Sequence, residues 1–301
     1  MTTFSISDND LVGIKDQVVV VTGITSASSG IGLATVKRLV QNGAKVFAAD
    51  LNELPEPEKS QVPFLKVNVT SWKDQLDLFK AAKEKYGIIH HAFANAGITT
   101  KTNLLEEDKD ENGDLLPPNL ITLDVNLTGV IYTVKLAIHY IRQHAEGGSI
   151  VMTGSGSSFS RFSATDYATA KHGVYGLLRS LYDNLHPKLP IRINAVAPSW
   201  TSTSIIPKEL IAILGDTVQT PDVVARSVLV LMADKERHGQ MIYSDRGRFT
   251  DIESGEDGLL GFTRKMLGAG YSAEEEGVKK MRAAIKKYVA EKEAEKEARK
   301  G

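Results

Sequence analysis

Short runs rich in β-branched residues alternate along the chain with segments in which apolar residues return every three or four positions. The strand-like runs are 18–21, 46–49, 64–67, 88–94, 150–153 and 191–196. The helix-like segments are 31–41, 72–86, 120–142 and 168–186. Continuously apolar strands are buried on both faces, and parallel strands need helical crossovers. The alternation therefore predicts an α/β fold built on a doubly wound parallel sheet.

The C-terminal third is less regular. Thr220 is expected to cap a helix that begins at Pro221, and a short strand at 241–243 is expected to close the sheet. Residues 249–271 mix large apolar side chains with glycines, which favours an apolar flap over a core element. These side chains are Phe249, Leu259, Leu260, Phe262, Met266 and Leu267. From Ala273 acids and bases interleave without an apolar stripe, so we expect one domain over 1–271 and a charged helical or frayed tail over 272–301.

The amino-acid composition excludes several classes of protein and several kinds of partner. The chain has 301 residues, near the upper size of one hydrophobic core, and 42% of them are hydrophobic, which excludes disorder for most of the length. The 36 basic and 37 acidic residues nearly balance, which argues against a nucleic-acid or membrane partner. The absence of cysteine excludes disulfides and thiolate nucleophiles. With a polar N-terminus and no apolar stretch of membrane-spanning length, we expect a cytoplasmic protein that acts on a small molecule.

A glycine-rich segment follows the first predicted strand. It runs from Thr22 to Gly32, with glycines at 23, 30 and 32, and leads directly into a predicted helix. Glycines there let the backbone turn sharply and approach a pyrophosphate at the helix N-terminus. Asp50 ends the next strand, where a carboxylate can accept hydrogen bonds from a ribose diol. An ordinary flexible loop is the alternative for the glycines alone, but the context favours a dinucleotide site.

A second constellation joins Tyr167 and Lys171, which are four residues apart on a predicted helix, to Ser155 after a strand. Residues at this spacing share a helix face, so the ammonium can favour the phenolate and lower the pKa of the tyrosine. A phenolate there would be a general base for an alcohol. Taken alone the pair could be a surface pair, but after a dinucleotide loop it indicates catalysis.

These motifs resemble those of the short-chain dehydrogenase/reductase family, in order, over residues 12–250. They are the glycine loop, Asp50, the Asn95-Ala96-Gly97 triplet, Asn126 in DVNLTG, Ser155, the Tyr167 and Lys171 pair, and the run from Asn194 to Pro198. The segments DVNLTG and RINAVAPSWTST are further similar to fungal 15-hydroxyprostaglandin-dehydrogenase-like members, including hydroxyaverantin-type dehydrogenases of polyketide pathways. The resemblance implies a single-domain Rossmann-type oxidoreductase that forms a homodimer or homotetramer.

The resemblance also implies a role for each matching residue. Tyr167 would be the acid/base, Lys171 would bind the nicotinamide ribose and tune Tyr167, Ser155 would hold the substrate oxygen, and Asn126 would position a proton-relay water. Besides Tyr167 and Lys171, the implied cofactor-binding residues are Gly23, Ser29, Gly30, Ile31, Gly32, Asp50, Leu51, Asn68, Val69, Asn95, Ala96, Gly97, Pro198 and Thr203. Among them Asn68 and Val69 would meet the adenine, and Thr203 would contact the nicotinamide carboxamide.

The chain departs from the family pattern at three places. Six residues separate Gly23 from Gly30 where the family usually has three, so the phosphate contacts within 25–29 stay open. Ser199 replaces a usual glycine, and Asn68 replaces a usual aspartate. Gly154 stands where a second serine is common, so Ser155 is the expected substrate anchor, with Ser157 and Ser158 as alternatives.

Two further groups of residues can be interpreted. Histidines 90, 91, 139 and 144 show no spacing with acids that marks a metal site, so packing or surface roles are expected and no metal is predicted. Trp200, Ile205, Ile206, Leu210 and Ile213 follow a strand at the carboxyl edge of the sheet, where doubly wound folds bind ligands. An apolar lid over the substrate is favoured there, with a core helix as the alternative.

Together these features predict an NAD-dependent dehydrogenase for a bulky, mostly apolar secondary alcohol. NAD is favoured because Asp50 would repel a 2′-phosphate and because positions 29 and 51 are Ser and Leu rather than basic residues. One alternative is an NADPH-dependent ketoreductase of a biosynthetic pathway. Another is a non-catalytic dinucleotide-binding regulator on the same fold, against which the complete catalytic set argues.

Overall fold

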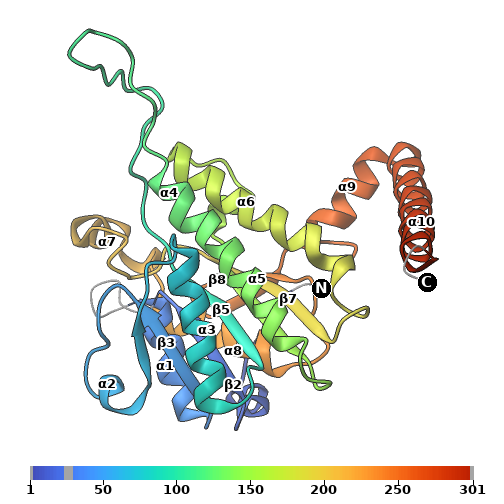
Figure 1. The fold of residues 1–301 in the computed structure, drawn as a ribbon. Helices are drawn as coiled ribbons and strands as arrows, with labels where there is room; N and C mark the ends of the chain where they lie inside the picture. Colours follow the sequence, from blue (N-terminus) through green and yellow to red (C-terminus); the bar gives the residue numbers. More distant parts are fainter. Residues whose placement is uncertain (1–2, 24–29, 299–301) are drawn as a thin grey trace. The chain divides into compact units, whose positions relative to one another are not determined.

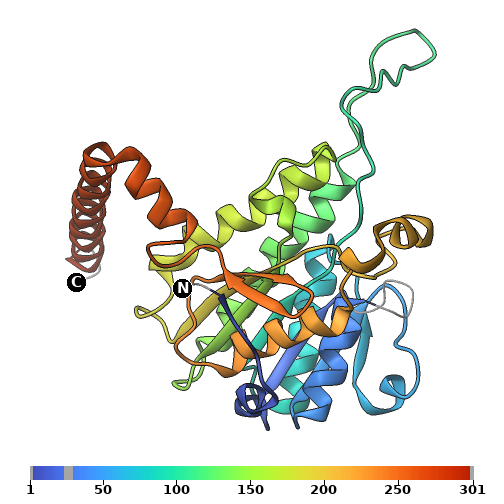
Figure 2. The ribbon, with the colours of Figure 1, turned by 180° about the vertical axis from the view of Figure 1, so that it is seen from behind.

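The structure, a computed structural model, describes residues 3–23 and 30–298. Its described strands form one sheet in the order β1-β9-β8-β7-β6-β5-β2-β3-β4 (Figures 1 and 2). The strands are β1 (Thr3–Phe4), β2 (Val18–Thr22), β3 (Lys45–Asp50), β4 (Phe64–Lys66), β5 (His91–Ala94), β6 (Gly148–Thr153), β7 (Ile191–Pro198), β8 (Met241–Asp245) and β9 (Arg248–Asp251). Strands β2 to β8 pair in parallel, which confirms the predicted doubly wound α/β sheet.

Helices cover both faces of this sheet. On one face α1 and α8 pack together with η1. On the other face α3 packs with α5, and α6 packs with η2 and β7. The helical segments are η1 (Asp8–Ile14), α1 (Ile31–Gln41), α2 (Glu58–Gln61), α3 (Trp72–Tyr86), α4 (Ile121–Leu123), η2 (Asp124–Thr128), α5 (Gly129–Ile141), η3 (Gly156–Ser158), α6 (Thr165–Leu181), η4 (Tyr182–Asn184), α7 (Lys208–Leu214), η5 (Gly215–Thr217), α8 (Pro221–Ala233), α9 (Leu259–Leu267) and α10 (Ala269–Ala298). The central strands are apolar because neither of their faces meets water: all five residues of β2 are buried.

The sheet edge differs from the sequence prediction. The strand at 241–243 does not close the sheet, because β9 pairs with β8 and β1 pairs with β9, both antiparallel. Phe249 lies in β9 and is buried in the core, where it stacks on Phe4. Its assignment to an apolar flap is therefore wrong.

The start of α8 also differs from the sequence prediction. Thr220 occupies the N-cap position before Pro221, as predicted, but its side chain makes no capping hydrogen bond. The first turn is held instead by Asp222, whose carboxylate accepts two hydrogen bonds of 2.7 Å from Arg38 of α1. This bidentate pair joins the two helices that lie next to each other on the sheet.

One helical run among the described residues is long and apolar enough, by length and composition alone, to cross a membrane. It is Ile121–Ile141, which joins α4, the π-helical turn η2 and α5. The sequence expectation that no stretch reaches this length is therefore wrong. Since α5 packs against β5, β6 and α3, part of the apolar composition of this run belongs to the core.

The chain divides into two compact units after Ile252, whereas the sequence places the boundary at residue 271. The second unit contains α9 and α10, and within it Arg264 pairs with Glu275. Along α10 four large apolar side chains recur at helical spacing and are about half exposed: Met281, Ile285, Tyr288 and Val289. The prediction that this region has no apolar stripe is therefore wrong for its central turns.

Candidate active site

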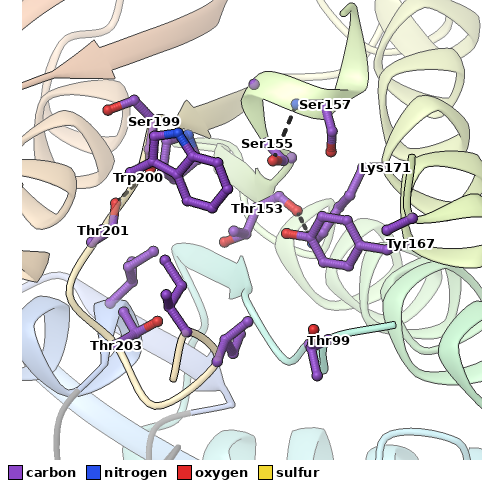
Figure 3. Close-up of a pocket in the computed structure, with 18 of the residues that line it drawn as sticks. Thr99, Thr153, Ser155, Ser157, Tyr167, Lys171, Ser199, Trp200, Thr201 and Thr203 are labelled. Atoms are coloured by element: carbon purple, nitrogen blue, oxygen red, sulfur yellow. Dashed lines mark hydrogen bonds between the residues drawn. The ribbon is translucent and has the colours of Figure 1, made fainter. Parts of the chain in front are cut away.

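A cavity of about 410 Å³ opens at the carboxyl edge of the parallel strands. Residues that follow β2, β5, β6 and β7 line it, and doubly wound sheets bind their ligands in such a crevice at the carboxyl ends of the strands. The cavity brings together ten of the residues predicted for catalysis or cofactor binding: Gly23, Gly30, Ile31, Asn95, Gly97, Ser155, Tyr167, Lys171, Pro198 and Thr203. Figure 3 shows several of these side chains directed toward the same space.

The turn after β2 forms one wall. Gly23 has a φ of +72°, and a Cβ built on it would lie 2.3 Å from the Cα of Ala96, so only glycine fits. Asn95 fixes this approach by donating from Nδ2 to the Gly23 carbonyl at 2.5 Å. Its own Oδ1 accepts from the Thr153 hydroxyl at 2.9 Å. The wall is thus lined by backbone and pre-formed, as close contact with a pyrophosphate needs. Ser29 and the other residues of 24–29 lie outside the described residues.

Lys171 is buried beneath the cavity, where its Nζ donates to the carbonyl of Thr153 at 2.7 Å. Burial disfavours the ammonium and lowers the pKa of Lys171 to about 8. The ammonium form still predominates at neutral pH. Its nitrogen lies 5.6 Å from the ring centroid of Tyr167, as expected for residues one helical turn apart on α6.

Tyr167 and Ser155 meet in the cavity. Burial raises the pKa of the Tyr167 phenol, and a hydrogen bond with the Ser155 side chain opposes that rise. The predicted lowering of the pKa is therefore not a property of the protein chain alone, because burial is the larger effect. Ser155 caps η3, where its side chain accepts from the Ser157 N–H at 3.2 Å. The Ser158 hydroxyl is engaged by the N–H of Ser155, and the Ser157 hydroxyl is buried, although Ser157 also lines the cavity. Ser155 stays the expected anchor because its side chain is hydrogen-bonded with Tyr167.

Asn126 lies outside the lining of this cavity. It is fully buried in the π-helical turn η2, a distortion common at functional sites. Both ends of its amide bind Ile98: Oδ1 accepts from the N–H at 2.8 Å and Nδ2 donates to the carbonyl at 2.9 Å. The side chain therefore fixes the loop after β5, and its proton-relay role stays a prediction.

The predicted adenosine end lies at the same sheet edge. Asp50 ends β3 beside the glycine turn, since the Gly23 N–H donates to the carbonyl of Ala49 at 2.9 Å. Leu51, which follows, is 55% exposed. Gly32 is buried in the first turn of α1, as close packing of this helix on the sheet requires.

Two residues predicted to meet the adenine have local roles as well. Asn68 accepts hydrogen bonds from the N–H and the hydroxyl of Thr70, at 3.1 and 2.9 Å. Val69 is buried and packs against Gly129, where an added Cβ would lie 3.0 Å away. Their adenine contacts stay predictions.

The segment after β7 covers the cavity. Trp200, Ile205, Ile206, Pro207 and Leu210 all line it, and α7 has no buried residue. Both observations favour the lid over the core-helix alternative. Ile213 is the exception, because it is 80% exposed and lies outside the lining.

Several lining residues were missed by the sequence interpretation. Thr153 connects Lys171, predicted for catalysis, with Asn95, predicted for cofactor binding. Its carbonyl accepts from Lys171, and its hydroxyl donates to Asn95. Phe162 and Tyr243 also line the cavity. Phe162 lies between the predicted Ser155 and Tyr167, so its position in the catalytic segment was the available signal, whereas nothing in the sequence marks Tyr243 beyond its place in a strand.

The histidines have packing roles. His90 Nδ1 accepts from the N–H of Val18 at 2.9 Å, His91 bonds the Ser149 hydroxyl at 2.8 Å, and His144 bonds the carbonyl of Ile89 at 2.8 Å. No cluster of three potential metal ligands occurs within 3–23 and 30–298.

A glycine turn and a Ser–Tyr–Lys set at one edge of a parallel sheet define an oxidoreductase that uses a nicotinamide dinucleotide. The family model for short chain dehydrogenases matches residues 17–210. The chain belongs to the short-chain dehydrogenase/reductase family.

Relatives and solved structures agree with this assignment. The chain is 47% identical over 258 residues to the short-chain dehydrogenase/reductase ascJ of Acremonium egyptiacum, covering 84% of this chain and 86% of that protein. It is 28% identical over 286 residues to the 5′-hydroxyaverantin dehydrogenase of Dothistroma septosporum, covering 84% and 92%. Among solved structures, the aldohexose dehydrogenase of Thermoplasma acidophilum is 26% identical, with a TM-score of 0.64 and coverage of 79% and 95%.

Proposed function

We propose that the protein oxidises a bulky, mostly apolar secondary alcohol with NAD, or reduces the corresponding ketone with NADH. The observation that carries the proposal is that Ser155, Tyr167 and Lys171 line the same cavity as the Gly23 turn. Oxidation of a secondary alcohol needs an oxygen anchor, a base and an adjacent hydride acceptor. The bound nicotinamide dinucleotide supplies the hydride acceptor.

The chain's own residues handle the hydroxyl proton. Ser155 holds the substrate oxygen beside Tyr167, and Tyr167 takes its proton as the carbinol C–H bond breaks. The Lys171 ammonium, whose pKa of about 8 leaves it mostly charged at pH 7, favours the phenolate that this step requires. In the reduction direction Tyr167 donates the same proton, for which its raised pKa is suited.

The lining supports a bulky apolar substrate. Trp200, Ile205, Ile206 and Leu210 place four apolar side chains over the site, and Phe162 adds a fifth. Burying such a substrate removes apolar surface of both the substrate and the lining from water, which favours binding. A relative is named for 5′-hydroxyaverantin, which is consistent with a substrate of this kind.

NAD is proposed because Asp50 lies at the end of β3, beside the glycine turn. There its carboxylate can accept from both ribose hydroxyls, whereas a 2′-phosphate meets a like charge. The exposed neighbour Leu51 offers no compensating cation.

Cofactor kinetics test this proposal. The wild type is expected to favour NAD over NADP by about a hundredfold in kcat/KM, because like-charge repulsion and lost hydrogen bonds both act against NADP. Replacing Asp50→Ala together with Leu51→Arg is expected to weaken NAD and improve NADP. Glu53→Ala is the matched control, since it removes a carboxylate from the same loop.

The assay is the absorbance of the reduced cofactor with a panel of secondary alcohols, including 2-propanol and a polycyclic alcohol. Higher efficiency with the polycyclic alcohol is expected. A wild-type preference for NADP would overturn the role of Asp50 and favour the biosynthetic ketoreductase. No turnover with either cofactor would favour the regulator. The homodimer or homotetramer and the cytoplasmic location stay predictions.

A further inference from the structure

Three aromatic rings follow one another along one side of the cavity: Tyr167, Phe162 and Trp200, here called the aromatic wall. The ring centroids of Tyr167 and Phe162 are 6.4 Å apart, and those of Phe162 and Trp200 are 6.2 Å apart. The interplanar angles of 64° and 63° make both contacts edge-to-face. The wall therefore begins at the proposed base and extends away from it in two steps.

Backbone hydrogen bonds hold the far end of the wall in place. The carbonyl of Trp200 accepts from the N–H of Gln219 at 2.8 Å, and the N–H of Ser199 donates to Ser244 at 2.9 Å. Thr201 is buried, and its hydroxyl donates to the Ser199 carbonyl at 2.8 Å. Trp200 is thus fixed by the end of β7, and Figure 3 shows its indole directed into the cavity.

The two outer rings keep much of their surface open. Phe162 is 43% exposed and Trp200 is 39% exposed, although both line the cavity. Large aromatic side chains are mostly buried in folded proteins, because each contributes a large apolar area. An edge-to-face contact uses the edge of one ring and one face of its neighbour, so ring surface stays available to a flat ligand.

We propose that the aromatic wall is a subsite for an aromatic ring of the substrate, which narrows the substrate class to secondary alcohols or ketones that carry an aryl group near the reacting carbon. The inference rests on the proposed function. A ring attached close to the carbinol carbon meets Phe162, because Phe162 adjoins Tyr167. A second fused ring reaches Trp200.

Two alcohols of the same skeleton test the subsite: 4-phenylbutan-2-ol and 4-cyclohexylbutan-2-ol. Their rings differ in aromaticity but not in attachment, and neither ring is conjugated with the carbinol carbon. Aromatic contacts favour the phenyl compound beyond its area burial, so we expect a kcat/KM ratio of about ten in its favour. Equal efficiencies in the wild type would overturn the proposal.

Two variants test whether the rings of Phe162 and Trp200 cause the preference for the phenyl compound. Phe162→Leu and Trp200→Leu keep an apolar side chain but remove a ring, so each is expected to bring the phenyl-to-cyclohexyl ratio several-fold closer to one. Phe159→Leu is the matched control, because it removes a ring from the same connection outside the cavity lining. It is expected to keep the wild-type ratio. A rise in the KM for NAD in Phe162→Leu, with the substrate ratio unchanged, would assign the wall to the cofactor instead.

A binding measurement separates this inference from the proposed function. Trp72 and Trp200 are the two tryptophans, so in the Trp72→Phe protein the indole emission comes from Trp200. Addition of 4-phenylbutan-2-one is expected to change this emission at lower concentration than 4-cyclohexylbutan-2-one, whether or not turnover occurs. Equal affinities would overturn the subsite, whereas tight phenyl binding without turnover of any alcohol would overturn only the proposed function.

Discussion

Burial of the Lys171 ammonium destabilises the fold, and the proposed role of this residue beside Tyr167 explains why it is kept. Its side chain is almost completely buried, and the Thr153 carbonyl accepts one of its three N–H groups. Burial lowers its pKa from an ordinary value of 10.5 to about 8, because the charged form loses the solvation that water would give it. The same position places the ammonium one turn from Tyr167.

Removing that charge should therefore stabilise the fold. A lysine whose pKa is lowered in the folded state binds fewer protons than the unfolded chain between about pH 8 and 10.5, so its penalty is full below pH 8 and disappears above 10.5. At pH 7 we expect Lys171→Met to raise the free energy of unfolding by on the order of 2 kcal/mol, after the lost hydrogen bond is counted.

Urea unfolding of both proteins from pH 7 to 10.5 measures this difference. The gap is expected to narrow as the pH rises, while activity is lost at every pH. Lys135→Met, on the outward side of α5, is the control and should leave the stability nearly unchanged. A lower free energy of unfolding for Lys171→Met at pH 7 would show that the buried charge does not destabilise the folded protein.

Asp166 joins the start of α6 to the loop after β5. Burial alone raises the pKa of its carboxyl, but hydrogen bonds from the N–H of Lys101, the hydroxyl of Thr100 and the N–H of Tyr167 outweigh that effect and bring it to about 2. The neighbouring Thr102 N–H also donates to it at 3.1 Å. This carboxylate thereby holds the backbone next to Tyr167, the proposed acid/base.

We expect Asp166→Asn to lower the free energy of unfolding at pH 7 by on the order of 2 kcal/mol, because the amide accepts these bonds less strongly. A lowered pKa in the folded state means that the stabilisation is present above about pH 3.8 and is lost as the pH falls toward 2. The difference between the two proteins should shrink over that window in chemical unfolding. Glu84→Gln, on the exposed side of α3, is the control, and a pH-independent difference would contradict the account.

Long, periodic elements were predictable, whereas short edge elements were not. The predicted helices at 31–41 and 72–86 have the observed bounds of α1 and α3, because each shows apolar residues over three or more turns. The strand β1 has two residues and β9 has four, too few to show a period. Phe249 looked like part of a flap because its partner strand lies near the other end of the chain.

The site shows the same division. Glycine, serine, tyrosine and lysine at fixed spacings identified Gly23, Ser155, Tyr167 and Lys171, since each spacing implies a local geometry. Thr153, Phe162 and Tyr243 were not predictable, because their place in the cavity depends on which strands and loops become neighbours. The direction of the Tyr167 pKa shift was not predictable for a related reason: the extent of burial is a property of the folded environment.

The end of α10 should be dispensable for folding and for turnover. Beyond Ala290, every side chain that the structure describes is exposed. Lys292 and Glu295 form an ion pair on this surface. Such pairs contribute little to stability. We expect a chain that stops at Ala290 to keep full turnover and to change its Tm by no more than about 2 °C.

Thermal unfolding and steady-state rates of the shortened chain check this expectation. A large fall in either would show that the end of the helix docks on the body or on a second subunit.

Tyr167→Phe tests whether Tyr167 moves the substrate proton, as proposed. The change keeps the ring and its packing but removes the phenol, so kcat should fall by at least about a hundredfold while the Kd for NAD stays within about twofold of the wild type. Tyr182→Phe, which removes the hydroxyl of a half-exposed tyrosine just after α6, should leave both quantities unchanged. Wild-type turnover in Tyr167→Phe, measured by the absorbance of the reduced cofactor, would contradict the account.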